Sequence, residues 1–384
     1  MNKTIYMDYA ATTYTKPEVL KEMLPYFTEN YGNPSSVYSI ARTTRRAIDR
    51  SRDRVAAAIN AKASEIFFTA SGSEADNWAL KGIAFGNRNK GKHIITTKIE
   101  HHAILHVCDY LEKHGFDVTY LSVDKQGFVN LDELEKVIRQ DTILVSIMFA
   151  NNEIGTIQNI KAIGNICKKN NVYFHTDAVQ AAGHVPIDVD EMNIDMLSLA
   201  AHKFYGPKGI GVLYIRRNVH IDNLLHGGSQ ERGRRAGTEN IPSIVGLGKA
   251  LELAVKNMNE NSMRISKLRD RLITGLMEIP GTILNGPSGK SRLSGNVNVC
   301  FKGIEGEAVL VLLDNEGICA SSGSACTSGA IDPSHVLLAL GLPHELAKGS
   351  LRLTLGDGST EKEVDEVIAA VKTAVGKVRS MTLR

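Results

Sequence analysis

The stretch from residue 143 to residue 215 contains four short β-rich runs, which read ILVSIMF (143–149), VYFHT (172–176), MLSLAA (196–201) and GIGVLYI (209–215). A segment with helical periodicity, residues 160–170, separates the first two runs. Strands that alternate with helices in this way predict a mainly parallel sheet with helices on both faces. Coverage of both faces also explains why these runs are almost wholly apolar.

The same alternation continues toward the N-terminus. The expected strands there are EIFFT (65–69), HIITT (93–97) and VTYLSV (118–123), and the expected helices cover residues 17–30, 40–60, 74–87, 102–114 and 131–139. One long helical stretch is expected from residue 243 to about residue 276. Beyond it we expect strands at 296–301 and 350–355 and helices near 305–315, 333–340 and 360–378. The sequence therefore predicts an α/β protein with a second, smaller α+β domain.

Composition favours a globular protein with a sizeable core. The chain has 384 residues, of which 43% are hydrophobic and 23% charged, and its formal net charge is +3. The basic residues are dispersed, which argues against a nucleic-acid partner. No apolar run approaches the ~18 residues that span a bilayer, and the first residues do not resemble a signal peptide. We therefore expect a cytoplasmic protein that binds neither nucleic acid nor membrane.

The five cysteines are scattered and form no C-x-x-C pair. An odd, dispersed set predicts free thiols rather than a disulfide framework or a zinc site. Cys326 lies in a run of Ser, Gly and Ala, typical of an exposed, reactive thiol on a loop, although a loop cysteine without function is the alternative. Cys319, beside Ile318 and Ala320, is expected to be a buried packing residue.

Polar residues that could take part in catalysis or binding follow the predicted strands. Ligands of open parallel sheets bind at the carboxyl ends of the strands. Lys203 follows MLSLAA and could form a Schiff base with an aldehyde cofactor; a surface loop lysine is the alternative. Asp177 ends the VYFHT run and could keep a pyridine nitrogen protonated, or it could simply cap a helix. Gly72 and Ser73 could present backbone N–H groups to a phosphate, with Ser73 as an ordinary N-cap as the alternative.

Three further segments have the same placement. His101 is a candidate acid–base or ring-stacking group. His102 and His106 are four residues apart and could share one helix face, but no third ligand with suitable spacing completes a metal site. The tandem Asn151 and Asn152 require a ligand or a neighbouring loop to satisfy their hydrogen bonds. The Gly-rich segment HGGSQERGRRAGTEN (226–240) could reach an anion, even across a subunit boundary.

Taken together, these motifs identify a family. The chain contains, in order, DYAATT, YGNPSS, SGSEADN, EHHAI, NNEIG, TDAVQ, AHKFYGPKG, HGGSQERGRRAGT and SSGSACTSG. This series resembles the NifS/IscS-type cysteine desulfurases, which belong to the class-V branch of the fold-type-I pyridoxal-phosphate enzymes. The resemblance extends from about residue 6 to residue 378.

The resemblance implies a large cofactor-binding domain of residues 15–257 with a seven-stranded sheet between helices. A small α+β domain of residues 1–14 and 258–384 would carry a loop, at about residues 319–332, with the reactive cysteine. The implied reaction removes sulfur from L-cysteine, giving L-alanine and a persulfide on Cys326 that supplies iron–sulfur cluster assembly or another sulfur-transfer pathway. The implied partners are a second copy of the chain and a sulfur-acceptor or iron–sulfur scaffold protein.

The resemblance also assigns roles to individual residues. The implied catalytic residues are Lys203 as the Schiff-base lysine, His101 as the ring-stacking proton shuttle, and Cys326. Asn152 and Arg352 would take the substrate carboxylate, and no metal is implied. The cofactor would be held by Gly72, Ser73, His101, Asn152, Asp177, Gln180, His202 and Lys203, together with Thr238 from the other subunit.

One position departs from the family pattern, because Ala200 replaces a serine that usually donates to the phosphate. The alternative interpretations are another pyridoxal-phosphate enzyme, such as an aminotransferase or selenocysteine lyase, and a sulfur-relay scaffold without activity. The thiol of Cys326 argues against the first, and the presence of Lys203, Asp177 and His101 argues against the second.

Overall fold

The computed structural model describes residues 4–322 and 333–382. A seven-stranded sheet lies at its centre, with the strand order β2-β8-β7-β6-β5-β3-β4. Strand β8 is antiparallel to both of its neighbours, and the remaining pairs are parallel. The strands are β2 (Ile66–Thr69), β3 (His93–Thr97), β4 (Asp117–Leu121), β5 (Thr142–Ser146), β6 (Tyr173–Asp177), β7 (Met196–Ala200) and β8 (Gly211–Ile215). The predicted mainly parallel sheet is confirmed.

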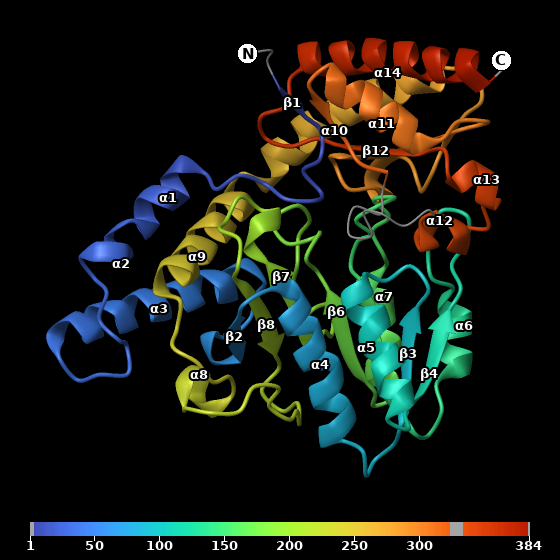
Figure 1. Ribbon diagram of the computed structural model, residues 1–384. Helices are drawn as coiled ribbons and strands as arrows, with labels where there is room; N and C mark the ends of the chain where they lie inside the picture. The colour runs from blue at the N-terminus through green and yellow to red at the C-terminus, as the bar shows by residue number, and fades with distance from the viewer. Residues whose placement is uncertain (1–3, 323–332, 383–384) are drawn as a thin grey trace.

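Helices cover both faces of this sheet (Figure 1). On one face, α4 (Gly72–Gly86) and α5 (His102–Lys113) bury Trp78, Ile83 and Val107 against Met196 and Leu213. The other face packs against α3 (Ser39–Ala58), α7 (Ile160–Lys169) and α9 (Ile241–Lys256). Because successive strand residues point to opposite faces, both faces of each central strand must be apolar.

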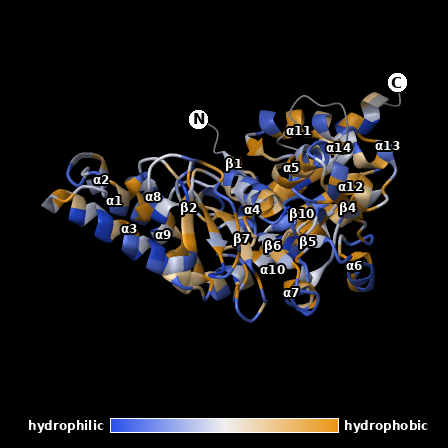
Figure 2. Cartoon of the chain, turned by 90° about the horizontal axis from the view of Figure 1, so that it is seen from below, coloured by the Kyte–Doolittle hydropathy of each residue, from blue (hydrophilic) through white to orange (hydrophobic). Residues whose placement is uncertain are grey.

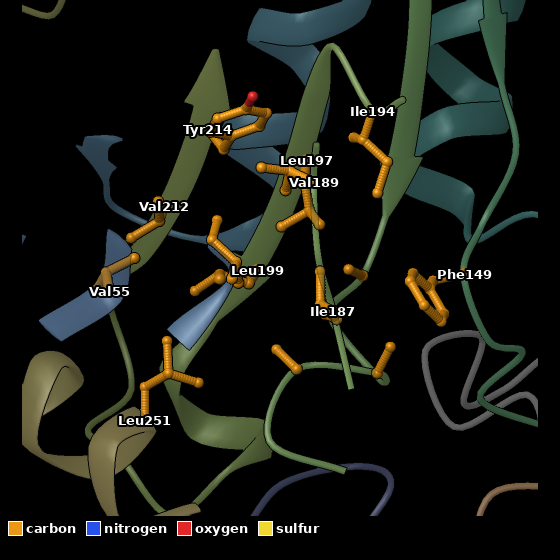
Figure 3. Packing of buried hydrophobic residues seen from close by; sticks show 14 of the residues in the cluster. Val55, Phe149, Ile187, Val189, Ile194, Leu197, Leu199, Val212, Tyr214 and Leu251 are labelled. Atoms are coloured by element: carbon orange, nitrogen blue, oxygen red, sulfur yellow. The ribbon is translucent and has the colours of Figure 1, made fainter. Parts of the chain in front are cut away.

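Figure 3 shows the second of these faces from close by. Leu197, Leu199 and Val212 project from β7 and β8, while Val55 of α3 and Leu251 of α9 pack from the helical layer. The outer side of α3 is hydrophilic, so this helix carries both colours in Figure 2. Burial of such apolar side chains contributes roughly 1.5–3 kcal/mol each to the free energy of unfolding.

Elements from both ends of the chain form a separate hydrophobic cluster. It contains a three-stranded antiparallel sheet of β9 (Thr282–Leu284), β10 (Asn296–Phe301) and β12 (Ser350–Thr354), with α10 (Met258–Met277), α11 (Gly306–Asn315) and α14 (Glu361–Thr382) packed on it. Strand β1 (Ile5–Tyr6) pairs in parallel with β11 (Ile318–Cys319). Both termini therefore lie on the same side of the molecule (Figure 1). The exact domain bounds of 15–257 and 258–384 remain a prediction.

Two helical expectations differ from the structure. The stretch expected as one long helix is two helices, because α9 ends before Asn257, whose φ of −101° and ψ of 5° are not helical, and α10 begins at Met258. Asn hydrogen-bonds to nearby backbone and so favours helix ends. The first expected helix is also divided, into α1 (Pro17–Met23) and α2 (Pro25–Thr28). Pro25 has no N–H to continue α1 and is favoured at a helix start.

Short helices complete the described chain: α6 (Leu131–Val137), α8 (Gln230–Gly233), α12 (His335–Ala339) and α13 (His344–Ala347). Across residues 4–322 and 333–382, no helix has the length and apolar content needed to cross a membrane.

Candidate active site

A cavity of about 370 Å³ lies at the carboxyl ends of the central strands. It brings together most of the residues predicted for the site: Gly72, Ser73, His101, Asn152, Asp177, Gln180, His202, Lys203 and Arg352. Ala10 and Ala11, from the segment after β1, close one side of it. The cavity therefore joins residues of the large sheet to both ends of the chain.

Lys203 follows β7 through a short 3-10 turn at Ala201–Lys203. Its Nζ donates hydrogen bonds to the carbonyl oxygens of Ala10, at 2.6 Å, and Ala11, at 2.8 Å. Gln180 donates from Nε2 to the same Ala10 oxygen at 3.0 Å. The amine is thus held at the cavity wall by the backbone of the N-terminal segment.

Asp177, the last residue of β6, is almost fully buried. Its Oδ1 accepts a hydrogen bond from the Val179 N–H at 2.9 Å. Burial raises the pKa of Asp177 to about 6, and the Val179 N–H and the nearby Lys203 oppose this rise. A carboxylate at the bottom of such a cavity is suited to a protonated ring nitrogen.

Asp76 lies beside Asp177 and was missed by the sequence analysis. It is four residues after Gly72, so it lies on the same face of α4, and it lines the same cavity. Its Oδ1 is buried without a hydrogen-bond partner among the described residues, and Nε2 of His175 lies 3.7 Å from it. Burial and then the charge of Asp177 raise the pKa of Asp76 well above its usual value. Lys203 lowers the pKa of Asp177 and not that of Asp76, which favours the charge on Asp177.

The N-terminus of α4 forms the polar end of the cavity. The N-cap of this helix is Ser71, because its Oγ accepts from the Glu74 N–H at 3.1 Å. The alternative role of Ser73 as the N-cap is therefore wrong. A Cβ at Gly72 would lie 2.8 Å from Cγ2 of Val179, so only glycine leaves this space open. Free backbone N–H groups and the helix dipole at this end favour a phosphate.

His101 is the N-cap of α5, and its Nδ1 accepts from the Ala103 N–H at 3.1 Å. Burial, followed by the charge of Lys203, lowers the pKa of His101 to about 4. The imidazole is therefore neutral near pH 7, with its proton on Nε2. His202 bonds through Nδ1 to Oγ1 of Thr12 at 3.1 Å, and burial lowers its pKa to about 4 as well.

Arg352 extends from β12 into the cavity. Its Nη1 donates to the carbonyl oxygen of Asn152 at 3.3 Å, and its Nη2 donates to Oδ1 of Asp8 at 2.9 Å. The neighbouring Asn151 does not face the cavity; its Nδ2 donates to the Ile99 oxygen at 2.9 Å. The side-chain amide of Asn151 is thus hydrogen-bonded within the protein, which agrees with a neighbouring loop, rather than a ligand, satisfying this asparagine.

One predicted residue, Thr238, is not part of the described lining of this cavity. Thr238 is exposed, and the segment before it is tied to α4 by an ion pair of 2.8 Å between Arg235 and Glu74. Cys326 lies outside the described residues. Cys319, expected to be buried, is half-buried in β11.

His102 stacks on His106, with ring centroids 5.0 Å apart, and contacts His335 at 4.7 Å. Within the described part of the chain, no group of three or more His, Cys, Asp or Glu side chains could hold a metal ion.

The fold and the cavity together define a pyridoxal-phosphate enzyme. Its residues fit that cofactor: an amine for the aldehyde, a buried carboxylate for the ring nitrogen, and a glycine-opened helix N-terminus for the phosphate. The class-V aminotransferase model matches residues 5–367. The chain belongs to this family, and within it to the cysteine desulfurases of the NifS/IscS type.

Relatives agree over the full length. The chain is 62% identical over 384 residues to "Cysteine desulfurase IscS" of Clostridium botulinum, covering 100% of this chain and 97% of that protein. A solved "NIFS-LIKE PROTEIN" superposes with a TM-score of 0.92 at 40% identity, covering 97% of this chain and all of the other. A structure titled "SspA in complex with cysteine" has a TM-score of 0.82 at 39% identity, covering 93% and 100% of the two chains.

Proposed function

We propose that this cysteine desulfurase transfers the sulfur of L-cysteine to Cys326 by means of the residues lining the cavity. The observation that carries the proposal is the convergence of Lys203, Asp177 and Arg352 on one cavity of about 370 Å³. These three provide an amine, a buried anion and a carboxylate-binding guanidinium. The structural relative whose title names bound cysteine supports this substrate.

Substrate orientation falls to Arg352 and Asn152. A planar guanidinium binds a carboxylate through two hydrogen bonds, which fixes the position of the amino acid as well as its charge. Lys203 and His101 line the same cavity as Arg352. An amino acid held at Arg352 by its α-carboxylate would therefore share the cavity with the amine that is to take the proton from Cα.

Pyridoxal phosphate supplies an aldehyde for amines and a ring that withdraws electrons from the substrate. Gly72, Ser73 and His202 would hold its phosphate, and Asp177 its ring nitrogen. Gln180 would contact its phenolic oxygen. Lys203 would hold the cofactor through its amine, and the same amine, when free, is the base for the proton on Cα of the substrate. His101, neutral with its proton on Nε2, can donate and recover a proton at the substrate thiol.

The sulfur transfer balances without an external redox partner. The Cys326 thiolate attacks the substrate sulfur, a new S–S bond forms, and the Cβ–S bond breaks. Cβ keeps the electron pair of that bond and takes up one proton, equal in number to the proton that the Cys326 thiol loses, which gives alanine. Cysteine and one protein thiol therefore become alanine and one persulfide.

Dimerisation would complete the phosphate site. Thr238 is exposed in the single chain and belongs to a polar segment tied to α4. A Thr238 hydroxyl from the second copy would then reach the phosphate. The chain would work in the cytoplasm and pass the persulfide sulfur to an acceptor or iron–sulfur scaffold protein.

The direct test is to incubate the holoenzyme with L-cysteine and without a reductant, and to measure alanine and protein-bound sulfur. One equivalent of alanine should appear for each persulfide formed, and peptide mapping should place the sulfur on Cys326. Alanine without persulfide, or sulfur on another cysteine, would refute the proposed transfer.

A further inference from the structure

We propose that Asp8 is an affinity-limiting residue whose carboxylate partly neutralises Arg352 and so limits how tightly the cavity holds an amino-acid carboxylate. The inference rests on the proposed role of Arg352 as the substrate-carboxylate residue. It goes further in assigning to Asp8 the balance between binding cysteine and releasing alanine.

The contact between the two residues is direct. Nη2 of Arg352 lies 2.9 Å from Oδ1 of Asp8, and the exposed fractions of the two side chains are 2% and 17%. The other described contact of the guanidinium, at 3.3 Å, is to the neutral carbonyl of Asn152. Asp8 is therefore the carboxylate that accepts a hydrogen bond from Arg352 within the described residues, while the buried Glu153 interacts with Arg352 through its charge alone.

The backbone fixes Asp8 in this place. Asp8 forms a parallel bridge with Thr354 of β12, and the Thr354 N–H donates to the Met7 oxygen. Two residues later, the Ala10 N–H donates to Oγ1 of Thr354 at 2.9 Å. Because Arg352 and Thr354 belong to the same strand, the carboxylate of Asp8 and the guanidinium are held in register.

Burial strengthens the electrostatic effect of Asp8 on its neighbours. Loss of solvent raises the pKa of Asp8, while the charge and hydrogen bond of Arg352 and the charge of Lys203 oppose this rise. Asp8 thus also acts on the amine, although its hydrogen bond is to the guanidinium. In such a partly desolvated site, charges a few ångströms apart interact far more strongly than in water.

A substrate carboxylate that binds Arg352 meets a guanidinium already shared with a second anion. The two carboxylates repel each other, so part of the attraction is lost. Cysteine and alanine carry the same α-carboxylate, and this loss therefore weakens both. An unshared arginine would retain alanine after the sulfur had left, and turnover requires alanine to leave.

The test compares Asp8→Asn and Asp8→Ser with Asp8→Glu in the holoenzyme. The dissociation constant of L-alanine is measured from the change in cofactor absorbance at fixed ionic strength, and KM and kcat are measured with L-cysteine. Removing the charge should tighten alanine binding and lower the KM by roughly tenfold or more. The kcat should fall once alanine release becomes limiting, and Asp8→Glu should stay closer to the wild type than Asp8→Asn.

The opposite sign overturns the inference. If Asp8 only supports the structure, its neutral variants bind alanine more weakly, or both lose pyridoxal phosphate. Arg352→Lys serves as the control for the proposed function. If that variant binds cysteine as well as the wild type, the role of Arg352 is wrong; if it binds poorly while Asp8→Asn is unchanged, only the role of Asp8 is wrong.

Discussion

The amine of Lys203 lies 2.6 Å from the carbonyl oxygen of Ala10, a residue 193 positions earlier in the sequence. The residue that is to react with the cofactor is thus held by a backbone group that can only accept a hydrogen bond. This arrangement orients Nζ before the cofactor binds, and it makes Lys203 the first position to test.

Lys203→Ala should abolish covalent attachment of pyridoxal phosphate. Borohydride reduction of the wild-type holoenzyme should add the mass of the cofactor to the peptide containing Lys203. The variant should show no added mass, although its phosphate-binding helix can still retain the cofactor non-covalently. A reduced adduct on another lysine would contradict the assignment.

Asp177→Asn should lower kcat strongly, because an amide cannot keep the ring nitrogen protonated. We expect a loss of roughly a hundredfold or more, typical for removal of a preorganised electrostatic group. Asp76→Asn is the matched control, since it replaces a carboxyl that we infer to be neutral. Its loss should be much smaller, and equal losses in the two variants would show that the charge is not confined to Asp177.

Cys326→Ala should separate cofactor chemistry from sulfur transfer. The variant should bind pyridoxal phosphate and show a cysteine-dependent spectral change, but form neither alanine nor persulfide. Cys319→Ala should retain turnover and lose on the order of 1 kcal/mol of stability as a half-buried packing residue. Wild-type turnover in the Cys326 variant would leave the loop without a catalytic role.

Glu100→Gln should change the pH dependence of stability. Glu100 is buried, accepts from Oγ1 of Thr97 at 2.7 Å and the Met148 N–H at 2.9 Å, and burial raises its pKa from 4.5 to about 8. Between these values the folded state keeps a proton that the unfolded state has lost, so this group lowers the free energy of unfolding as pH rises.

The variant lacks that contribution. Denaturant unfolding should therefore show Glu100→Gln gaining stability relative to the wild type between pH 5 and pH 8, on the order of 2 kcal/mol or more. A difference that does not change with pH would mean that Glu100 is ionised throughout. Asp365→Asn, on the surface of α14, is the control without this trend.

Large apolar side chains are exposed on the segment around α1 and α2. The exposed fractions are 58% for Phe27, 69% for Tyr31 and 88% for Val37. Such a gathering is typical of a protein interface. If the second copy covers it, Phe27→Asp and Val37→Asp should shift the chain toward monomer in sedimentation and weaken cofactor retention. Val311→Asp, 62% exposed on α11, should do neither. A dimer unaffected by both changes would place the interface elsewhere.

Residues at strand ends could be found from the sequence because the sheet type fixes where they meet. The expected strand at 296–301 matches β10, and the rule that ligands bind at carboxyl ends brought Lys203 and Asp177 together. Asp8 and Asp76 could not be found in this way. Their importance depends on which remote side chain faces them, Arg352 in one case and Asp177 in the other. A local sequence pattern does not show which remote side chain will lie beside a given residue. The helix breaks at Pro25 and Asn257 differ in this respect, because proline and asparagine favour helix ends by themselves.

The parallel pairing of β1 with β11 has a consequence for biosynthesis. The first strand is made early, yet Ile5 can pair only after Ile318 has been made. The bridge between Asp8 and Thr354 likewise forms only after Thr354 has been made. Contacts between such distant positions form slowly, since a long loop must close first. The central sheet, complete at Ile215, can therefore assemble before the last strand has been made, while the segment that holds Lys203 is fixed by Thr354 of β12. A nascent chain that ends before Thr354 should thus lack a competent active site.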